Sequence, residues 1–499
     1  MKLFKKIICM IMSLCLMLSV AGCGRDGAQT NGDITKLKMV LVGEKPAVFD
    51  EVWGKVNEML REDIGAEVEI EYYQYGDLQQ KYSLLFSSGE YVDLVFSADW
   101  LKYNKQASMN SFMEITDDML KKNAPKTYKT LTETMKKEAS VNGKLYMVPH
   151  TIPAYSNYTV LVRGDLREKY GMPEITSAEL LEEYLENVAK KDKQMIPFTD
   201  TGKKIREIFV TNPRGEIYLD IPSSTGLAYD VVKGKFTVNI DTKAYVDTYR
   251  KVREFVEKGI LPADIIANKT TDNMFENGKS ATYINNLDTT TKLAVELRES
   301  HPEWKVELCD VSMGAPKIVN SCISNGISIG RTSKNADKAL QFIELLRNDR
   351  RYYDLTQYGI EGKHWKADGE DGFISLNEKL PAEEQYIAGC VWGWLNEGMN
   401  RVDRNVLPEN VAILEKWKKD TIDTDIRGFI FDDSNVKTEM TTISGVGSQY
   451  GSPLVNGMID KNKIDKTLKD YRAVLEKAGI KKVYEEVNKQ YAEYRKANK

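Results

Sequence analysis

Strand and helix patterns alternate between residues 37 and 96, and this order constrains the fold more than any other feature of the chain. Apolar residues alternate with polar ones in two segments and form a continuous run in a third, as in half-buried and fully buried strands. Between these segments, apolar residues recur at helical spacing. A β-α-β-α-β order predicts a parallel sheet with right-handed crossovers, and thus an α/β fold. The predicted strands are 37–43, 68–72 and 91–96, and the predicted helices are 52–65 and 78–88.

Loops after the predicted strands supply the first candidate ligand residues. In open α/β sheets, ligands bind beyond the carboxyl ends of the strands. Here Tyr75 follows the second strand, and Asp99 and Trp100 follow the third. An acidic group beside a large aromatic suits a polar ligand with an apolar face. A second interpretation stays open, in which Trp100 caps the core and Asp99 is the N-cap of the next helix.

The first 23 residues resemble a secretory signal peptide with its cleavage site. Lysines at positions 2, 5 and 6 precede an apolar run at 7–20, which is shorter than the roughly 20 residues of a membrane-spanning helix. Val20-Ala21-Gly22 then precedes Cys23, and this order resembles a bacterial lipobox. The resemblance implies that the signal peptide 1–22 is removed and that Cys23 carries a diacylglyceryl group and an acyl chain such as palmitate, which would anchor the protein to the membrane. The alternative is an uncleaved helix with an incidental cysteine.

The composition limits the remaining classes of protein. With 499 residues, of which 42% are hydrophobic, the chain is large enough for two or three domains. Its net charge of −4, without a basic stripe, argues against a nucleic-acid partner. Residues 23–35 are polar and glycine-rich and are expected to form a flexible tether.

The cysteines predict few disulfides or none. Once the signal peptide and the lipidated cysteine are set aside, Cys309, Cys322 and Cys390 remain. Because three is an odd number, at least one of them is expected to be a free thiol. A pairing of Cys309 with Cys322 across a hairpin stays open.

Enzyme signatures are weak in this sequence. The histidines His150, His301 and His364 are far apart and have no zinc-ligand spacing, and no Gly-x-Ser-x-Gly motif occurs. Asn277-Gly278-Lys279-Ser280 resembles the end of a P-loop, but Asn273 stands where the first glycine belongs. We therefore expect no catalytic residues, no metal and no cofactor. A surface glycoside hydrolase with two facing carboxylates remains the enzyme alternative.

Several segments together resemble extracellular solute-binding proteins of ABC importers, in a Gram-positive branch with LplA-like lipoproteins. Each segment is a weak signal, but their order and spacing along the mature chain are more specific. Besides the lipobox and the alternating first segment, the resemblance rests on residues 142–149, 163–171, 324–339, 358–365 and 478–490.

The resemblance implies a type II periplasmic-binding-protein fold with two α/β lobes and a helical C-terminal region. The lobes would comprise 36–150 with about 318–400, and 151–317 with about 401–499. Such proteins close around a ligand and dock on membrane permeases. It further implies a monomer, held by its lipid on the extracellular face, that binds a sugar or an oligosaccharide. A peptide or another polar solute is the alternative ligand.

Further ligand candidates come from loops near the expected cleft. Tyr155 and Tyr158 follow the crossover between Pro149 and Pro153, and Asn285 and Asn286 follow a short strand. Each aromatic candidate could pack in a core instead. The remaining candidates are the tryptophans of two later loops, Trp365, Trp392 and Trp394.

Overall fold

The computed structural model describes residues 34–155, 157–220, 225–262 and 273–497. The predicted signal peptide, Cys23 and most of the predicted tether lie outside the described residues. Thr35, the last residue of that tether, is already the first residue of strand β1 (Thr35–Val42). Within the described residues, no helix is long and apolar enough to cross a membrane.

A five-stranded sheet is built from the first alternating segment and two later strands. β1 lies between β2 (Ala66–Tyr73) and β3 (Leu94–Ser97) and is parallel to both. The predicted parallel order of these strands is therefore confirmed. β13 (Gly326–Ile329) then pairs antiparallel with β3 and with β6 (Val148–Pro149), which makes the sheet mixed.

Both predicted crossover helices are present and end where the sequence indicates. α2 (Phe49–Ile64) buries Val52, Val56 and Leu60 on one face. It ends at Gly65 in the left-handed conformation (φ 62°), which glycine adopts without a steric penalty. α3 (Leu78–Ser88) ends at Gly89 in the same way.

Two smaller sheets, of which one is centred on β7, are antiparallel throughout. β7 (Thr159–Arg163) is flanked by β11 (Thr282–Asn285) and β12 (Val306–Cys309). The other sheet has the order β10-β9-β8. Its strands are β8 (Tyr218–Leu219), β9 (Leu227–Asp230) and β10 (Lys235–Val238).

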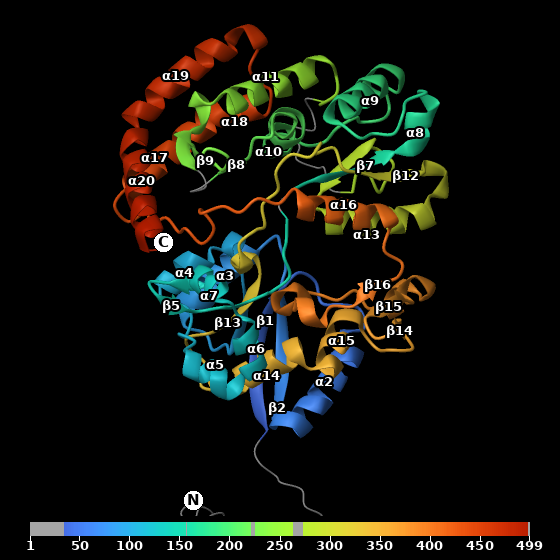
Figure 1. The fold of residues 1–499 in the computed structure, drawn as a ribbon, viewed down its shortest axis with the longest axis vertical. Helices are drawn as coiled ribbons and strands as arrows, with labels where there is room; N and C mark the ends of the chain where they lie inside the picture. The colour runs from blue at the N-terminus through green and yellow to red at the C-terminus, as the bar shows by residue number, and fades with distance from the viewer. Residues whose placement is uncertain (1–33, 156, 221–224, 263–272, 498–499) are drawn as a thin grey trace, which may run out of the picture.

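Figure 1 shows these sheets in two groups of elements, with β1, β2 and β13 in the lower group and β7, β9 and β12 in the upper one. Helices and short strands of the lower group are α4 (Tyr103–Ser108), α5 (Asp117–Asn123), α6 (Pro125–Thr130), α7 (Glu133–Glu138), β4 (Ser140–Val141), β5 (Lys144–Leu145), α14 (Ala336–Asn348), α15 (Arg350–Tyr358), β14 (Trp365–Asp368), β15 (Gly372–Ser375) and β16 (Val402–Asp403). Helices of the upper group are α8 (Gly164–Lys169), α9 (Ala178–Lys191), α10 (Lys203–Ile205), α11 (Lys243–Glu257), α13 (Leu287–Ser300), α16 (Pro408–Lys419), α17 (Lys437–Val446), α18 (Ser452–Val455), α19 (Ile464–Lys477) and α20 (Ile480–Ala497).

The hydrophobic cores follow the same division. One core joins residues 37–148 with 323–394. The C-terminal helices share another core with β8, β9, β10 and α11. The chain passes between the groups in stretches that contact one another: Asn320 N donates to Ala154 O (2.8 Å), and Thr151 N donates to Leu395 O (3.0 Å).

A buried carboxylate also joins the two groups. Glu138, at the end of α7, is 4% exposed, and its Oε1 lies 2.9 Å from Nε of Arg427. Its Oε2 accepts hydrogen bonds from Ser321 Oγ (2.7 Å) and Cys322 N (2.8 Å). The Arg427 carbonyl in turn accepts a hydrogen bond from Tyr494 Oη of α20 (2.6 Å). One carboxylate thus connects a lower helix, a crossing segment and the C-terminal helices.

The three cysteines in the described residues are free thiols, so the alternative pairing of Cys309 with Cys322 is wrong. Cys309 ends β12, whereas Cys322 lies in a short turn before β13, and β12 and β13 belong to different sheets. Desolvation raises the pKa of Cys309, Cys322 and Cys390 above the usual thiol value.

We expect these thiols to be inert in the folded protein, because the thiolate is the reactive form and burial suppresses it. A chain made without its first 23 residues should incorporate no iodoacetamide under native conditions. It should incorporate three equivalents in denaturant without a reductant. One equivalent in denaturant would instead indicate a disulfide.

Candidate functional site

The tip of β3 carries the best-placed candidate residue. Trp100 lies in a short turn (Asp99–Leu101) and keeps 45% of its surface exposed. Its Nε1 donates a hydrogen bond to the Ser324 carbonyl (2.9 Å), and its ring packs against Phe96 at 5.8 Å between centroids. The hydrogen bond and the Phe96 contact therefore hold one edge of the indole in place, and the exposed remainder of the ring could contact a ligand.

Asp99 supports this turn and remains open to solvent. Its Oδ1 accepts a hydrogen bond from the backbone N–H of Trp100 (2.6 Å), which is a local side chain–backbone interaction. The N-cap of this turn is Ala98 and that of α4 is Lys102, so the alternative that Asp99 is an N-cap is wrong. The Asp99 side chain is exposed, yet desolvation raises the pKa of its carboxyl above the usual value. The carboxyl is thus accessible to a ligand, while the protein around it disfavours its charged form.

The other lower-group candidates separate into open and buried residues. Tyr75 is 61% exposed, and its ring lies beside Gly43 at the end of β1. Trp392 is half-buried and contacts the same Phe96 ring as Trp100, at 6.1 Å. Trp392 and Trp100 therefore share one core phenylalanine as a neighbour.

Two tryptophans lie inside cores and offer no free surface. Trp394 is 0% exposed, and its Nε1 donates to Thr356 Oγ1 (3.2 Å). Trp365 is 3% exposed, and its Nε1 donates to the Gly359 carbonyl (2.9 Å). In this conformation both indole N–H groups are already satisfied, so packing accounts for both residues.

Candidates of the upper group gather around a short helical segment after residue 200. Tyr158 is half-buried, and Lys203 Nζ and Lys204 Nζ each lie 5.7 Å from its ring centroid. Lys204 Nζ also donates to the Ile284 carbonyl (2.7 Å), directly before Asn285. The lysine pair thus joins Tyr158 to the end of β11.

The two asparagines already have local partners. Asn286 is the N-cap of α13, with its Oδ1 accepting from Thr289 N (2.9 Å). Asn285 Nδ2 donates to Tyr283 Oη (2.9 Å). Tyr155 lies in a crossing segment, where its ring contacts Trp417 at 5.7 Å.

Lys203 and Glu207 were missed by the sequence analysis. Lys203 Nζ lies 3.5 Å from Glu207 Oε1, at the point where α10 continues into a π-helical turn (Arg206–Thr211). Desolvation raises the pKa of Glu207, although its side chain keeps some exposure. Such turns are frequent at functional sites but have no clear sequence signature. The sequence signal that could have pointed here is Gly202, which precedes the segment and adopts a positive φ of 58°.

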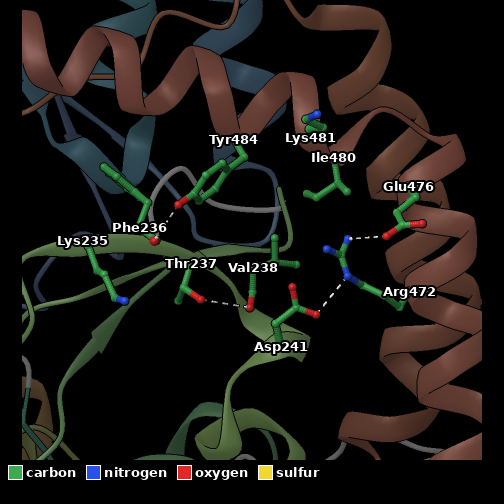
Figure 2. A pocket seen from close by; sticks show the side chains of 10 residues that line it. All are labelled: Lys235, Phe236, Thr237, Val238, Asp241, Arg472, Glu476, Ile480, Lys481 and Tyr484. Atoms are coloured by element: carbon green, nitrogen blue, oxygen red, sulfur yellow. Dashed lines mark hydrogen bonds and ion pairs between the residues drawn. The ribbon is translucent and has the colours of Figure 1, made fainter.

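A cavity of about 530 Å³ lies away from all these residues. It is bordered by β10 on one side and by α19 and α20 on the other (Figure 2). Arg472 crosses it between Asp241 (2.9 Å) and Glu476 (3.7 Å). None of the predicted ligand residues lines this cavity.

The three histidines each have a different local partner. His150 contacts Ser324, His301 stacks on Trp304 at 4.0 Å, and His364 Nδ1 accepts a hydrogen bond from Ile360 N (2.9 Å). In the part of the chain that the structure describes, no three His, Cys, Asp or Glu side chains are arranged to hold a metal ion.

Comparison with known proteins decides the family. The model of the bacterial extracellular solute-binding protein family matches residues 56–360, which is more than half of the chain. The chain belongs to this family. A second model, a domain of unknown function (DUF3502), matches residues 425–496, which include α17 to α19 and all but the last residue of α20.

Relatives of this solute-binding protein match it over nearly its whole length. It is 25% identical to a carbohydrate ABC transporter substrate-binding protein of Streptococcus pneumoniae serotype 4, over 97% of both chains. Among solved structures, it resembles the N-glycan transport solute binding protein NgtS of S. pneumoniae (22% identity, TM-score 0.75, covering 93% of this chain and 100% of that one). It also resembles an HMO-binding solute-binding protein of Bifidobacterium longum infantis (16%, TM-score 0.67, covering 92% and 99%). These likenesses confirm the predicted type II fold.

Proposed function

We propose that this solute-binding protein captures an oligosaccharide outside the cell and delivers it, chemically unchanged, to the permeases of an ABC importer. The observation that carries the proposal is the match, over 97% of both chains, to a carbohydrate ABC transporter substrate-binding protein. The solved relative NgtS has been crystallised with Man5GlcNAc, and FusA of S. pneumoniae with kestose. Oligosaccharides are thus the ligands bound in two structures of this fold.

The side chains beyond the sheets suit such a ligand. A pyranose ring has an apolar face, which stacks on aromatic rings, and hydroxyl groups, which bond to carboxylates and cations. Trp100, Trp392 and Asp99 would form the lower wall of the site. Tyr158 and Lys203 would form the upper wall, and Tyr155 would lie at its base.

The two groups of elements in Figure 1 would then be lobes that close on the ligand. The lobe boundaries remain those predicted from the sequence, near residues 150, 317 and 400. Closure would bring the walls together because the ligand contacts both, which is how binding biases a hinge equilibrium.

The experiment is a binding screen with the chain that begins after residue 23. Thermal unfolding and calorimetry would be measured with manno-oligosaccharides, fructo-oligosaccharides, milk oligosaccharides and mixed peptides. We expect one oligosaccharide class to raise the Tm and to bind with a stoichiometry of one. Binding of peptides alone would contradict the proposal and favour the alternative solute. Release of reducing ends from any of the glycans would favour a hydrolase.

We also propose that Cys23 anchors the protein to the membrane. The Cys23→Ser variant of the full chain should then be released into the medium, because two or three acyl chains are needed for stable anchoring. Fractionation of cells expressing both forms checks this, with Cys322→Ser as the matched control that keeps its membrane location. Equal amounts of the Cys23→Ser variant and the parent in the membrane fraction would contradict the anchor.

A further inference from the structure

Arg347, near the end of α14, is a buried cation without a carboxylate in direct contact. The charge of Glu344, one turn earlier on α14, favours the cation from a distance, but the Glu344 oxygens accept hydrogen bonds from Lys126 N (2.8 Å) and Thr127 N (2.9 Å). Arg347 is 0% exposed. Its Nη1 donates to the Pro149 carbonyl (2.9 Å), whereas Nε and Nη2 have no hydrogen-bond partner in the described residues. Within those residues, no Asp or Glu oxygen comes within 4.0 Å of its guanidinium.

The other buried arginines show that this arrangement is exceptional. Arg206 is 5% exposed, and its Nη2 lies 2.9 Å from Oδ2 of Asp220. Arg163 is 8% exposed and forms two hydrogen bonds of 2.8 Å with Asp165. Both therefore carry a carboxylate as counter-charge, as buried ions generally do.

The free atoms of Arg347 form a ready anion-binding edge. Nε–H and Nη2–H lie on the same side of the planar guanidinium, and this edge binds anions through two parallel hydrogen bonds. Desolvation lowers the pKa of Arg347 to about 10, so the group is still cationic at neutral pH. The positive charge thus persists in the interior, and its Nε and Nη2 edge has no hydrogen-bond partner in the described residues.

A second polar atom without a partner lies on the neighbouring residue. His150 follows Pro149 in the chain, is 4% exposed and lies with Nε2 2.9 Å from Ser324 Oγ. Its Nδ1 has no partner in the described residues. Burial and the charge of Arg347 lower the pKa of His150 to about 4, so the ring is neutral at pH 7 and keeps one N–H.

We propose that a small inorganic anion, such as chloride, binds in the interior at the Nε and Nη2 edge of Arg347. Full burial of the guanidinium excludes a carbohydrate or a protein carboxylate from outside as the partner. The Arg347 carbonyl accepts a hydrogen bond from Asn396 Nδ2 (2.9 Å), and Pro149 begins a crossing segment. The anion would therefore stabilise the place where a crossing segment leaves the lower group. This site is independent of the proposed oligosaccharide.

The test compares thermal unfolding in sodium chloride and in sodium gluconate at equal ionic strength, without sugar. We expect the Tm of the parent protein to rise by about 2 °C or more in 200 mM chloride relative to gluconate, because a ligand of the folded state stabilises it by mass action. Arg347→Met removes the charge but keeps the length, and replacement of buried ions by apolar groups is often tolerated. This variant should unfold at the same temperature in both salts.

A matched control and a direct observation complete the test. Arg206→Met removes a buried arginine that has its own carboxylate, so this variant should keep the chloride effect. A crystal soaked in bromide should show an anomalous peak beside Nε and Nη2 of Arg347. Equal Tm values of the parent in both salts, or a water molecule at this edge in bromide, would overturn the proposal. Loss of the chloride effect in Arg206→Met would show a general salt effect and would overturn it too.

Discussion

Trp100→Ala should weaken oligosaccharide binding by one to two orders of magnitude. An indole buries about 150–250 Å² at most, and with 45% of Trp100 exposed about 100 Å² is available to a ligand. At about 25 cal/mol per Å² this area corresponds to about 2.5 kcal/mol, or nearly a 100-fold change in Kd. Some stability should also be lost, because the ring packs against Phe96 and its Nε1 donates to the Ser324 carbonyl, so binding is compared at a temperature where the variant is folded. Calorimetric titration with the sugar found in the screen measures the effect.

The matched control for this prediction is Trp304→Ala. Trp304 is also partly exposed, but it stacks on His301 at 4.0 Å and lies under the Arg163 guanidinium at 4.4 Å, away from the tip of β3. Its replacement should leave the Kd unchanged. If Trp100→Ala and Trp304→Ala behave alike toward an identified ligand, the assignment of the lower wall is wrong.

Trp394→Ala should destabilise the protein by about 3–5 kcal/mol, because truncation of a fully buried aromatic leaves a large cavity. The ring is 0% exposed, makes an edge contact with Trp53 at 6.3 Å and bonds to Thr356. Its immediate surroundings are tight: a Cβ on Gly393 would lie 2.9 Å from Ile327 Cδ1. Denaturant unfolding measures the loss.

The comparison with Trp392→Ala separates packing from ligand contact at this loop. Trp392 is two residues away and only half-buried, so its removal should cost less stability and more affinity. Trp394→Ala should bind the sugar normally at temperatures where it stays folded. A loss of affinity in Trp394→Ala without a loss of stability would mean that the ring reaches the ligand.

Local patterns predicted the secondary structure well because they depend on neighbours in the chain. The spacing of Val52, Val56 and Leu60 follows the helical period, and Gly65 ends that helix because its positive φ favours glycine. The third strand was predicted to begin at Tyr91 but begins at Leu94. Tyr91 instead stays exposed and donates its hydroxyl to Asp93 (2.8 Å), a side-chain interaction that hydrophobic periodicity does not report.

The positions of the loops were also predictable, but whether each loop side chain is buried or exposed was not. Trp100, Trp392 and Trp394 all follow apolar segments and have the same chemistry. Their exposure differs because of tertiary contacts: Trp392 packs against Phe96 from the first part of the chain, and Trp394 is buried and bonded to Thr356. Lys203 and Glu207 were missed for a related reason, because their position depends on a π-helical turn rather than on periodicity.

The α/β class, the first parallel strands with their loops and the resemblance to solute-binding proteins could be predicted from the sequence. These properties follow from local periodicity, glycine conformations and short motifs. Three features were visible only in the folded chain: β13 enters the first sheet antiparallel, the cysteines stay apart, and Arg347 lies buried without a carboxylate in contact. Each depends on contacts between residues some 200 positions apart or on the position of neighbouring segments in space. Such contacts depend on the packing of the whole chain, so no local sequence pattern predicts them.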